Sequence, residues 1–496
     1  MYRKKRKGWT KQVDFTPREN RKNKTNKSMT EKRHSQAKYY YRYCCMMILT
    51  ILATISFAGV WYNFVENHNI TGHLTGWGNL GMSAGIYFIL FFLMGKYLRA
   101  FKIGVDRKMN LIIGVVLTCM TVACFEVLIS LAILGEFRLF WKILGIYILM
   151  VLSQSIVLGL LMLPMVNIYR KFFPPIEILE VYGEYKNGLF DKISGRKDKY
   201  KVTKLISYKE GLDKIYAEFD KYDAILINDI PSDTRNALLK KCYAEDKRVY
   251  FTPKISDIIA KSSEELNLFD TPLCLCKNIG LSTTQLFWKR FFDIFLSGVA
   301  LIILSPILLI VSIAIHMEDG GPVFFKQERV TIGGERFMIL KFRSMIVDAE
   351  KDGRPHPAGE KDDRITKVGN FIRATRIDEL PQLINIFKGD MSIVGPRPER
   401  WEHDELYAKD IPEWPLRLKV KGGLTGYAQV YGKYNTTALD KLKLDLFYIT
   451  NYSLLLDIQI IFETVKIVLK KESTEGFSEE QGKKMHDETT VQDKLI

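Results

Sequence analysis

The run IFLSGVALIILSPILLIVSIAI, residues 294–315, is 22 residues long and contains no charged side chain. A helix needs about 20 consecutive apolar residues to cross a bilayer, so this run predicts a helix inserted in a membrane. Ser305-Pro306 lies in the middle of the run. Proline lacks a backbone N–H and clashes with the preceding turn, so it bends or breaks a helix. The run therefore predicts either a kinked transmembrane span or a helix that breaks and returns to the side from which it entered.

Four further runs with few or no charges precede this one, at about 46–64, 79–95, 111–134 and 144–166. Each has roughly the length of a transmembrane helix. The loop at 65–79 carries no Lys or Arg, whereas the loop at 96–108 carries five. Because positively charged loops stay on the cytoplasmic side, the N-terminus and the chain after the fourth span are predicted to be cytoplasmic.

The N-terminal segment, residues 1–45, is strongly basic. It holds 15 Lys and Arg against 3 Asp and Glu, a surplus of 12 in a chain whose net charge is +16. Because this segment leads directly into an apolar run, we expect a basic cytoplasmic tail that binds anionic membrane lipids and helps to fix the topology. Nucleic acid is not an expected partner.

Two isolated signals are interpreted as structural. The seven cysteines are odd in number, and their spacing fits neither a disulfide framework nor a zinc site. Glu126 lies inside the third apolar run, where an acid is often functional. Since no partner for it is visible, we interpret it as a protonated or hydrogen-bonded residue at a helix contact.

After Pro174-Pro175, residues 176–276 alternate between strand and helix patterns. Strands are expected at Ile176–Tyr182, Lys201–Ile206, Asp223–Asn228 and Lys247–Thr252. Helices are expected at Glu210–Phe219, Asp233–Tyr243 and Ile255–Leu266. Such alternation predicts a Rossmann-like α/β domain with a parallel sheet. Its first turn, residues 183–188, lacks the GxGxxG pattern, so no dinucleotide site is predicted.

The block at 281–471 carries the residues suited to chemistry. A β-hairpin is expected from Val323–Val330 and Arg336–Met345, with its turn at Gly333-Gly334. Lys341 and Arg343 lie two residues apart, so on a strand they would face the same way. They form either a solvated basic face or a pair of cations directed at a diphosphate.

An acidic pair, Asp378-Glu379, follows a basic amphipathic segment and is expected to open a helix. Alone, such a pair could simply cap that helix. Here it lies among cations and rigid turns, namely Arg373, Arg376 and the segment Pro396-Arg397-Pro398. Adjacent carboxylates can hold Mg²⁺, one of them can attack phosphorus, and the arginines can stabilise charge on phosphoryl oxygens.

Four motifs of this block together resemble a known family. They are Lys341-Phe-Arg-Ser-Met345, Asp378-Glu-Leu-Pro-Gln-Leu383, Gly389-Asp-Met-Ser-Ile-Val-Gly-Pro-Arg-Pro398 and Gly423-Leu-Thr-Gly-Tyr-Ala-Gln429. In identity and order they resemble the bacterial polyprenyl-phosphate sugar-1-phosphate transferases (phosphoglycosyl transferases), which initiate capsule, exopolysaccharide and O-antigen synthesis. The four N-terminal spans and the α/β domain resemble the long form of the family. Tyr427 stands where the family is expected to have tryptophan.

The resemblance implies specific roles. Asp378 would attack the β-phosphate of a UDP-sugar, release UMP and form a covalent aspartyl-phosphosugar, which polyprenyl (undecaprenyl) phosphate would then attack. Glu379 would position Mg²⁺ together with Asp378, or handle a proton. Lys341, Arg373 and Arg397 would bind phosphate and nucleotide. A hexose-1-phosphate is the expected group transferred, although an amino sugar stays open.

The resemblance also bears on the topology. The family has a re-entrant helix broken at Ser-Pro, which implies a re-entrant helix at 288–316 with its break at Ser305-Pro306. UDP-sugars are cytoplasmic, and four spans already return the chain to the cytoplasm. The predicted architecture is therefore a four-helix transmembrane bundle (46–166), a Rossmann-like α/β domain, and an α/β catalytic domain facing the cytoplasm at the bacterial inner membrane. Residues 472–496 are expected to form a polar tail.

Other function classes remain open at this point. A non-enzymatic membrane scaffold or sensor of polysaccharide assembly would have no need for both Asp378 and Glu379 among arginines. A transporter is suggested by Glu126 and the spans, but the predicted bundle shows no repeated or broken helices. A homodimer is possible, although no heptad or repeat indicates one.

Overall fold

The computed structural model describes residues 21–65, 68, 77–185, 187–266, 270–276, 280–347, 362–432 and 436–468. The first 20 residues of the predicted basic tail and the predicted polar tail at 472–496 lie outside these ranges. The chain divides into two compact units, Met1–Pro174 and Pro175–Ile496. The division falls between the two prolines at which the sequence changes from apolar runs to the α/β pattern.

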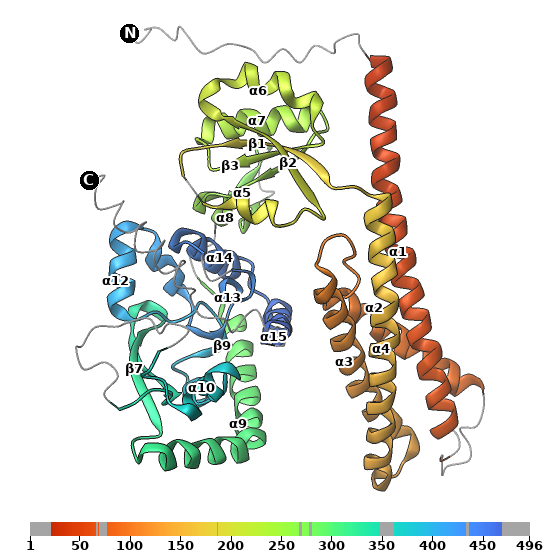
Figure 1. The fold of residues 1–496 in the computed structure, drawn as a ribbon, viewed down its shortest axis with the longest axis vertical. Coiled ribbons are helices and arrows are strands. Elements are labelled where there is room, and N and C mark those ends of the chain that lie inside the picture. The colour runs from red at the N-terminus through yellow and green to blue at the C-terminus, as the bar shows by residue number, and fades with distance from the viewer. Residues whose placement is uncertain are drawn as a thin grey trace. The chain divides into compact units, whose positions relative to one another are not determined.

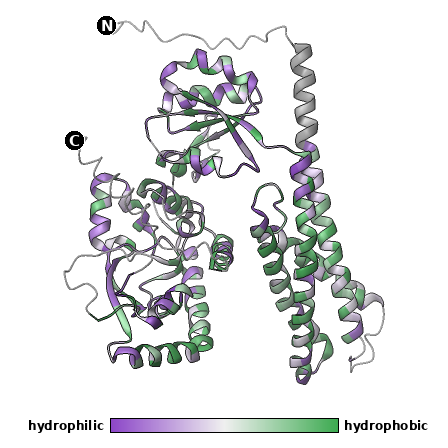
Figure 2. Ribbon diagram, in the orientation of Figure 1, coloured by the Kyte–Doolittle hydropathy of each residue, from purple (hydrophilic) through white to green (hydrophobic). Residues whose placement is uncertain are grey.

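The first unit consists of long helices. They are α1 (Arg21–Phe64), α2 (Trp77–Tyr97), α3 (Lys108–Leu134) and α4 (Phe140–Phe172), with a 3₁₀ turn, η2 (Phe137–Leu139), before α4 (Figure 1). The helices α2 to α4 are apolar along most of their length, and α1 is apolar in its C-terminal part (Figure 2). They pack around one hydrophobic cluster, in which the rings of Phe57 and Tyr87 stack with centroids 4.2 Å apart. The Tyr87 hydroxyl donates to Gln154 Oε1 at 2.9 Å.

The helix α1 begins earlier than the sequence reading suggested. Residues 21–45, which were expected to belong to a basic tail, are the first part of α1. Lys, Arg and Gln are good helix formers, and α1 contains no proline, so the helix extends beyond its apolar part. Glu126 in α3 is fully buried, and its carboxylate oxygens accept no hydrogen bond from the described residues. Its burial agrees with a helix-contact residue.

The second unit begins with an α/β domain that contains a four-stranded parallel sheet. Its strands are β1 (Ile176–Tyr182), β2 (Tyr200–Ser207), β3 (Ala224–Asn228) and β4 (Arg248–Phe251), in the order β2-β1-β3-β4. Its helices are α5 (Leu189–Ser194), α6 (Leu212–Glu218), α7 (Ser232–Ala244) and α8 (Ile255–Lys261), with 3₁₀ turns η3 (Tyr208–Glu210) and η4 (Phe219–Lys221). The predicted parallel sheet is confirmed.

Side chains alternate across this sheet, as its pleat requires. Leu179 and Val181 of β1 pack in one cluster with residues of α6 and α7, whereas Ile178 packs in another with residues of α5. The predicted helix at 255–266 was too long. It ends at Lys261, and Glu264–Leu266 forms β5, which pairs antiparallel with β6 (Leu273–Leu275). A short apolar stretch fits a helix or a strand equally well, and here pairing with β6 makes Glu264–Leu266 a strand.

A single long helix, α9 (Thr283–Asp319), opens the rest of the second unit. Ser282 and Gln285 form a capping box at its start, and Gly320 ends it with φ of 68°. The helix bends sharply part-way along its length (Figure 1), and it contains Pro306. Pro306 cannot donate to the carbonyl of Ile302, four residues earlier. The Ser305 hydroxyl donates to that carbonyl instead, at 2.8 Å.

The described residues contain five helices that are long and apolar enough to cross a membrane, namely α1 to α4 and α9. The protein is thus a mixed helix and sheet protein whose apolar helices suit a membrane (Figure 2). The first half of α9 is hydrogen-bonded to the segment Ser392–Val394: Asp293 Oδ1 accepts from the Ile393 N–H at 2.9 Å. Its second half contributes Val311 and Ile315 to a cluster with Phe342 and Ile372.

The predicted hairpin is confirmed as β7 (Phe324–Val330) paired antiparallel with β8 (Arg336–Phe342), around the 3₁₀ turn η5 (Ile332–Gly334). The following elements are α10 (Lys367–Ala374), η6 (Ile377–Glu379), α11 (Gln382–Lys388), β9 (Ser392–Val394), α12 (Trp401–Asp410), η7 (Trp414–Lys419), β10 (Gly423–Thr425), α13 (Tyr427–Tyr431), α14 (Ala438–Thr450) and α15 (Leu454–Val468). Strands β9 and β10 pair in parallel.

Candidate active site

A pocket lies where the hairpin meets the segment after β9. It is lined by Arg329, Ile339, Lys341, Gln382, Arg397, Pro398 and Gly423. Arg329 comes from β7, Lys341 from β8, and Arg397 from the turn that follows β9. Three of the seven lining residues are thus cationic, and they come from three separate elements.

The acidic pair lies beside this pocket on η6, a 3₁₀ turn, rather than in the first turn of a helix as predicted. The helix α11 starts only after Pro381. Arg376, immediately before the turn, adopts the left-handed conformation with φ of 60°. A residue other than glycine rarely adopts it, and such strain is often found at functional sites. This backbone turn brings Asp378 and Glu379 toward the cations of the hairpin.

Glu379 is tied to two of the pocket cations. Its Oε1 accepts from Arg397 Nη2 at 3.0 Å and from Lys341 Nζ at 3.4 Å. Asp378 is held differently, because its Oδ1 is buried without a hydrogen-bond partner among the described residues. The structure therefore gives the two neighbouring carboxylates separate environments.

The pKa values of the two acids diverge accordingly. Burial alone would raise the pKa of Glu379, but Arg397 and Lys341 outweigh it and lower this pKa to about 2. Burial raises the pKa of Asp378, and the charge of Glu379 adds to this rise, while Lys341, Arg376 and Arg373 act against it. Opposite pKa shifts in adjacent groups are typical of an acid–base or nucleophile assignment. Asp378 is thus the more basic of the two carboxylates.

The pocket carries more positive than negative charge. Burial lowers the pKa of Lys341 even though Glu379 lies beside it. Burial, together with the neighbouring Arg397, lowers the pKa of Arg329 to about 10. By contrast, contact with Glu379 raises the pKa of Arg397. A cluster of cations that is only partly neutralised suits a bound anion with several oxygens.

Two prolines and a close backbone approach fix the position of Arg397. The Pro396 carbonyl accepts from the Gly423 N–H at 2.9 Å, and the Pro398 carbonyl accepts from Arg329 Nη1 at 3.1 Å. A Cβ atom on Gly395 would lie 2.3 Å from the Lys421 carbonyl oxygen, so only glycine fits there. Proline fixes φ on both sides of Arg397. This segment thus presents the arginine from a rigid turn, as the sequence suggested.

The remaining predicted cations occupy other places. Arg373, in the last turn of α10, and Arg376 act electrostatically on Asp378. Arg343 does not line the pocket and does not share a target with Lys341. The strand β8 ends at Phe342, and Arg343 Nη1 binds Asp319 Oδ2 at 2.7 Å. The two cations expected to face one target therefore have different partners, Glu379 and Asp319.

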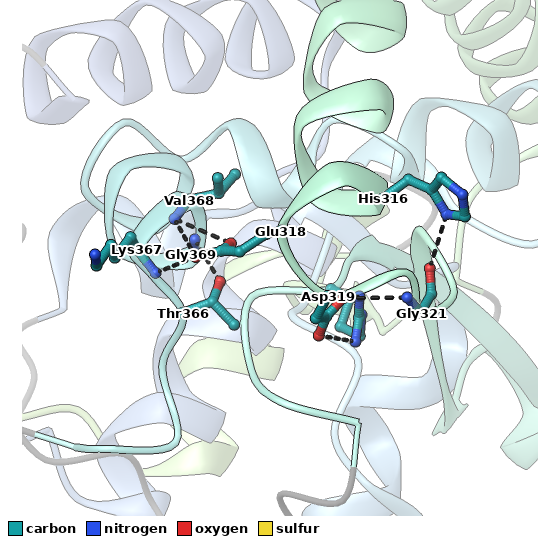
Figure 3. A network of polar contacts seen from close by, with 9 residues as sticks. His316, Glu318, Asp319, Gly321, Thr366, Lys367, Val368 and Gly369 are labelled. Carbon is teal, nitrogen blue, oxygen red and sulfur yellow. Dashed lines mark hydrogen bonds and ion pairs between the residues drawn. The ribbon is translucent and has the colours of Figure 1, made fainter.

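The C-terminal end of α9 holds the helix that leads to the acidic pair (Figure 3). The Glu318 carboxylate accepts from the backbone N–H of Lys367 at 2.8 Å, at the start of α10. Thr366 caps the same helix by accepting from the Gly369 N–H at 2.9 Å. Carboxylates at a helix start satisfy free N–H groups and interact favourably with the helix dipole. The end of α9 is thereby linked to α10 and, through it, to Asp378.

Arg329 and Gln382 line the pocket but were not predicted from the sequence. The hairpin was predicted, but its register was not: Arg329 pairs with Phe337 and Lys341 pairs with Phe325, and both cations line the pocket from different strands. A signal was present: the run Lys326-Gln-Glu-Arg329 places charged side chains in the first strand of the predicted hairpin. His403, on α12, lies against Tyr407 and does not line the pocket.

The acidic pair fits Mg²⁺ in part. The described residues contain no group of three or more His, Cys, Asp or Glu side chains arranged for a metal ion. Mg²⁺ is, however, often bound by one or two carboxylates, with substrate phosphates and waters completing its octahedron. Asp378, whose Oδ1 has no other partner among the described residues, and Glu379 provide such a donor set.

Comparison with known proteins assigns the part of the chain that contains this pocket to a family. The profile of the bacterial sugar transferases matches residues 284–471, which contain α9, the hairpin and the acidic pair. A UDP-glucose:undecaprenyl-phosphate glucose-1-phosphate transferase of Caulobacter vibrioides is 40% identical over 187 residues, which are 36% of this chain and 69% of that protein. The chain belongs to the bacterial sugar transferase family.

Longer relatives of this sugar transferase share more of the chain. A protein of the same name from Klebsiella pneumoniae is 37% identical over 303 residues, 58% of this chain and 61% of that protein. A UDP-N-acetylgalactosamine-undecaprenyl-phosphate N-acetylgalactosaminephosphotransferase from Aeromonas hydrophila is 36% identical over 255 residues, 50% of this chain and 59% of that protein. The sugar transferase thus spans about three fifths of the length of these two relatives, which are named for different sugars.

Proposed function

We propose that this protein transfers a sugar-1-phosphate from a UDP-sugar to polyprenyl (undecaprenyl) phosphate and releases UMP. The observation that carries the proposal is the acidic pair with opposite pKa shifts beside Arg329, Lys341 and Arg397. The cations suit the diphosphate of a nucleotide sugar, and Asp378 is the carboxylate free to attack it. The names of the relatives support the same donor and acceptor. In the cell, the reaction would begin exopolysaccharide, capsule or O-antigen synthesis.

The proposed reaction has two balanced steps. An Asp378 oxygen attacks the β-phosphorus, and the bond from that phosphorus to the bridging oxygen breaks, so that UMP leaves with the electron pair. An oxygen of polyprenyl phosphate then attacks the phosphorus of the aspartyl-phosphosugar, and the carboxylate of Asp378 is regenerated. Two steps remove the need to hold a soluble and a lipid substrate together.

The other residues bind and orient in this mechanism. Arg397 and Lys341 hold Glu379 ionised and face the phosphoryl oxygens, while Arg373 and Arg376 hold the pKa of Asp378 below what burial alone would produce. Pro396 and Pro398 keep Arg397 in place. Asp378 and Glu379 would hold Mg²⁺, which neutralises phosphoryl oxygens when bound. Arg343 acts at a distance, by fastening the end of α9.

The membrane arrangement is part of the proposal. The bend in α9 and the bond from Ser305 to the Ile302 carbonyl support a re-entrant helix broken at Ser305-Pro306. Such a helix would keep the pocket on the cytoplasmic side of the inner membrane, where UDP-sugars are made. The basic segment at 1–45 would then bind anionic lipids on that side. A homodimer would leave each pocket complete, because its residues come from one chain.

The test is a donor panel with purified protein in lipid, Mg²⁺ and polyprenyl phosphate, measuring UMP. We expect UMP from one of UDP-glucose, UDP-galactose, UDP-N-acetylglucosamine and UDP-N-acetylgalactosamine, and none with Asp378→Asn. Without polyprenyl phosphate, we expect one equivalent of UMP and a sugar-phosphate mass added to the peptide containing Asp378. A steady reaction with no trapped peptide would refute the covalent route. Absence of UMP with every donor would favour a scaffold or sensor.

A further inference from the structure

A fully buried ion pair lies behind the pocket, outside the residues already assigned to it. Arg417, on η7, and Asp445, on α14, each expose 1% of their side chains. Arg417 Nε donates to Asp445 Oδ2 at 2.9 Å, and Nη2 lies 2.8 Å from the same oxygen. The Arg417 guanidinium also lies over the buried Trp414 ring, 4.6 Å from its centroid.

The same guanidinium reaches the main chain of the pocket. Arg417 Nη2 donates to the Arg397 carbonyl at 2.9 Å. Pro396 and Pro398 leave Arg397 little freedom in the neighbouring backbone, so fixing this carbonyl also fixes the origin of the Arg397 side chain. At its other end, Arg397 Nη2 donates to Glu379 Oε1 at 3.0 Å. A continuous path of contacts thus runs from Asp445 to the acidic pair.

A second contact from α14 supports the same turn. Lys441, one helical turn before Asp445 and so on the same face, forms an ion pair with Glu399. Burial alone would raise the pKa of Glu399, but Lys441 and Arg417 lower it to about 2. The Glu399 carbonyl also accepts from the Val330 N–H of β7 at 3.0 Å. The helix α14 therefore supports the turn that carries Arg397 at two points. Its Asp445 holds Arg417, which donates to the Arg397 carbonyl, and its Lys441 forms an ion pair with Glu399, the residue after Pro398.

Stability alone does not account for such a pair. Burying two charges costs several kcal/mol per ion, and apolar pairs of similar volume are often as stable or more so. A guanidinium can, however, donate to two acceptors in a fixed geometry, which an apolar side chain cannot do. In this pair, one acceptor is Asp445 and the other is the backbone of a pocket arginine.

We propose that Arg417, held by Asp445, is a positioning residue that sets the place of Arg397 relative to Asp378 and Glu379. The inference rests on the proposed function, because it assigns Arg397 a role in phosphoryl transfer. Arg417 itself would touch neither substrate. Displacing a group by about 1 Å can cost about 100-fold in rate, so a change at Arg417 would be felt in catalysis.

The test replaces the pair without leaving a buried charge. In Arg417→Met/Asp445→Leu, packing is kept while the bond to the Arg397 carbonyl is lost. We expect a melting temperature near that of the wild type and a 10- to 100-fold lower kcat/KM for UMP release. Arg417→Lys, which keeps the charge opposite Asp445, should lose less. The matched control is Arg99→Met/Asp106→Leu, a partly buried pair in the first unit, which should keep full turnover.

A double-mutant cycle separates positioning from folding. If Arg417 acts through Arg397, adding the apolar pair to Arg397→Ala should lower kcat/KM no further. The inference is overturned if the apolar pair turns over within twofold of the wild type. It is also overturned if combining the apolar pair with Arg397→Ala multiplies the two separate decreases in kcat/KM.

Binding of UMP, measured by calorimetry, keeps the inference testable independently of turnover. We expect weaker UMP binding in the apolar pair than in the wild type, and unchanged UMP affinity would overturn the inference. A wild type that binds UMP but releases none from any donor contradicts the proposed function instead, and the binding comparison still decides the role of Arg417.

Discussion

At the scale of single residues, the two carboxylates of the acidic pair are chemically distinct although they are adjacent. Glu379 is stabilised as a carboxylate by Arg397 and Lys341, with a pKa of about 2. It therefore contributes stability above its unfolded pKa, and this contribution is lost as the pH falls toward 2. Asp378 is buried, and its pKa is raised. The ionised form of Asp378 is therefore less stable in the folded protein than in water, and this makes its carboxylate more reactive.

The first prediction concerns Asp378→Asn. The variant should lose at least about 10³-fold in UMP release, because the nucleophile is absent. It should nevertheless melt at or above the wild-type temperature, since a raised pKa means that the ionised side chain destabilises the folded state at neutral pH. Thermal unfolding at pH 7.5 checks this, with Glu379→Gln as the comparison. A clear fall in the melting temperature of Asp378→Asn would show that its carboxylate stabilises the fold.

The second prediction concerns pH. The acid limb of kcat/KM should lie above the ordinary pKa of an aspartate, because Asp378 must be ionised and its pKa is raised. Glu379→Gln removes a neighbouring negative charge and should move the limb to lower pH. The UMP burst should be followed without polyprenyl phosphate, whose own phosphate titrates near neutral pH. A limb that stays in place or rises in this variant would contradict the assignment.

The third prediction concerns Arg329, which the sequence reading missed. Arg329→Gln removes a pocket cation and its bond to the Pro398 carbonyl. We expect kcat/KM for the UDP-sugar to fall about 10- to 100-fold, equivalent to roughly 1.4–2.8 kcal/mol. Lys326→Met, on the same strand but exposed and outside the pocket lining, is the matched control and should keep its activity. Equal losses in both variants would mean that the effect is not local to the pocket.

At the scale of elements, α9 connects the apolar and the chemical parts of the second unit. Before Pro306, Arg290 donates to the Ile386 carbonyl at 2.7 Å, at the end of α11. After Pro306, Glu318 and Asp319 hold α10 and Arg343 (Figure 3). The two halves of one bent helix thus support the two sides of the acidic turn η6. The bend is therefore part of the site's geometry.

The fourth prediction tests the path of this helix through the membrane. In a cysteine-free background, Phe137→Cys, in the turn before α4, should react with an impermeant maleimide in intact cells. Lys388→Cys, exposed at the end of α11, should react only after the membrane is opened. A re-entrant α9 requires these opposite outcomes, because the first four helices already return the chain to the cytoplasm. Labelling of both sites from outside would mean that α9 spans the membrane.

At the scale of the whole molecule, the α/β domain is not a separate body from the part that carries the chemistry. Both belong to the unit Pro175–Ile496. Ile258 of α8 belongs to the same buried cluster as Leu442 and Leu446 of α14, and Lys192 of α5 lies 3.5 Å from Asp440. The helix α14 thus contacts the α/β domain as well as the turn that carries Arg397.

The fifth prediction follows from this shared core. Ile258→Ala should cost about 2–5 kcal/mol, because a buried side chain in a packed cluster is removed. Hydrogen exchange should then speed up in α8 and also in α14. Tyr243→Ala, at an exposed position on α7, should change neither helix. Unchanged exchange in α14 would show that the two domains are stable independently of each other.

Much of the fold was predictable, because period and composition are local properties. The apolar runs predicted α1 to α4 and α9, and the alternation after Pro175 predicted a parallel sheet whose four strands lie within about two residues of their expected places. Boundaries were less accurate: α1 starts at Arg21, and α8 ends at Lys261. Such ends depend on capping and on pairing with distant segments, which a local pattern does not contain.

By itself, the sequence determined the classes of element, the order of the motifs and the residue types of the site, since these are properties of neighbouring residues. Only the tertiary structure decided which side chains meet. It placed Arg329 in the pocket, paired Arg343 with Asp319 instead, and joined Arg417 to the Arg397 carbonyl. These contacts join residues between 20 and 70 positions apart. Strand register and side-chain packing decide which of these distant residues come into contact, and both exist only in the folded chain.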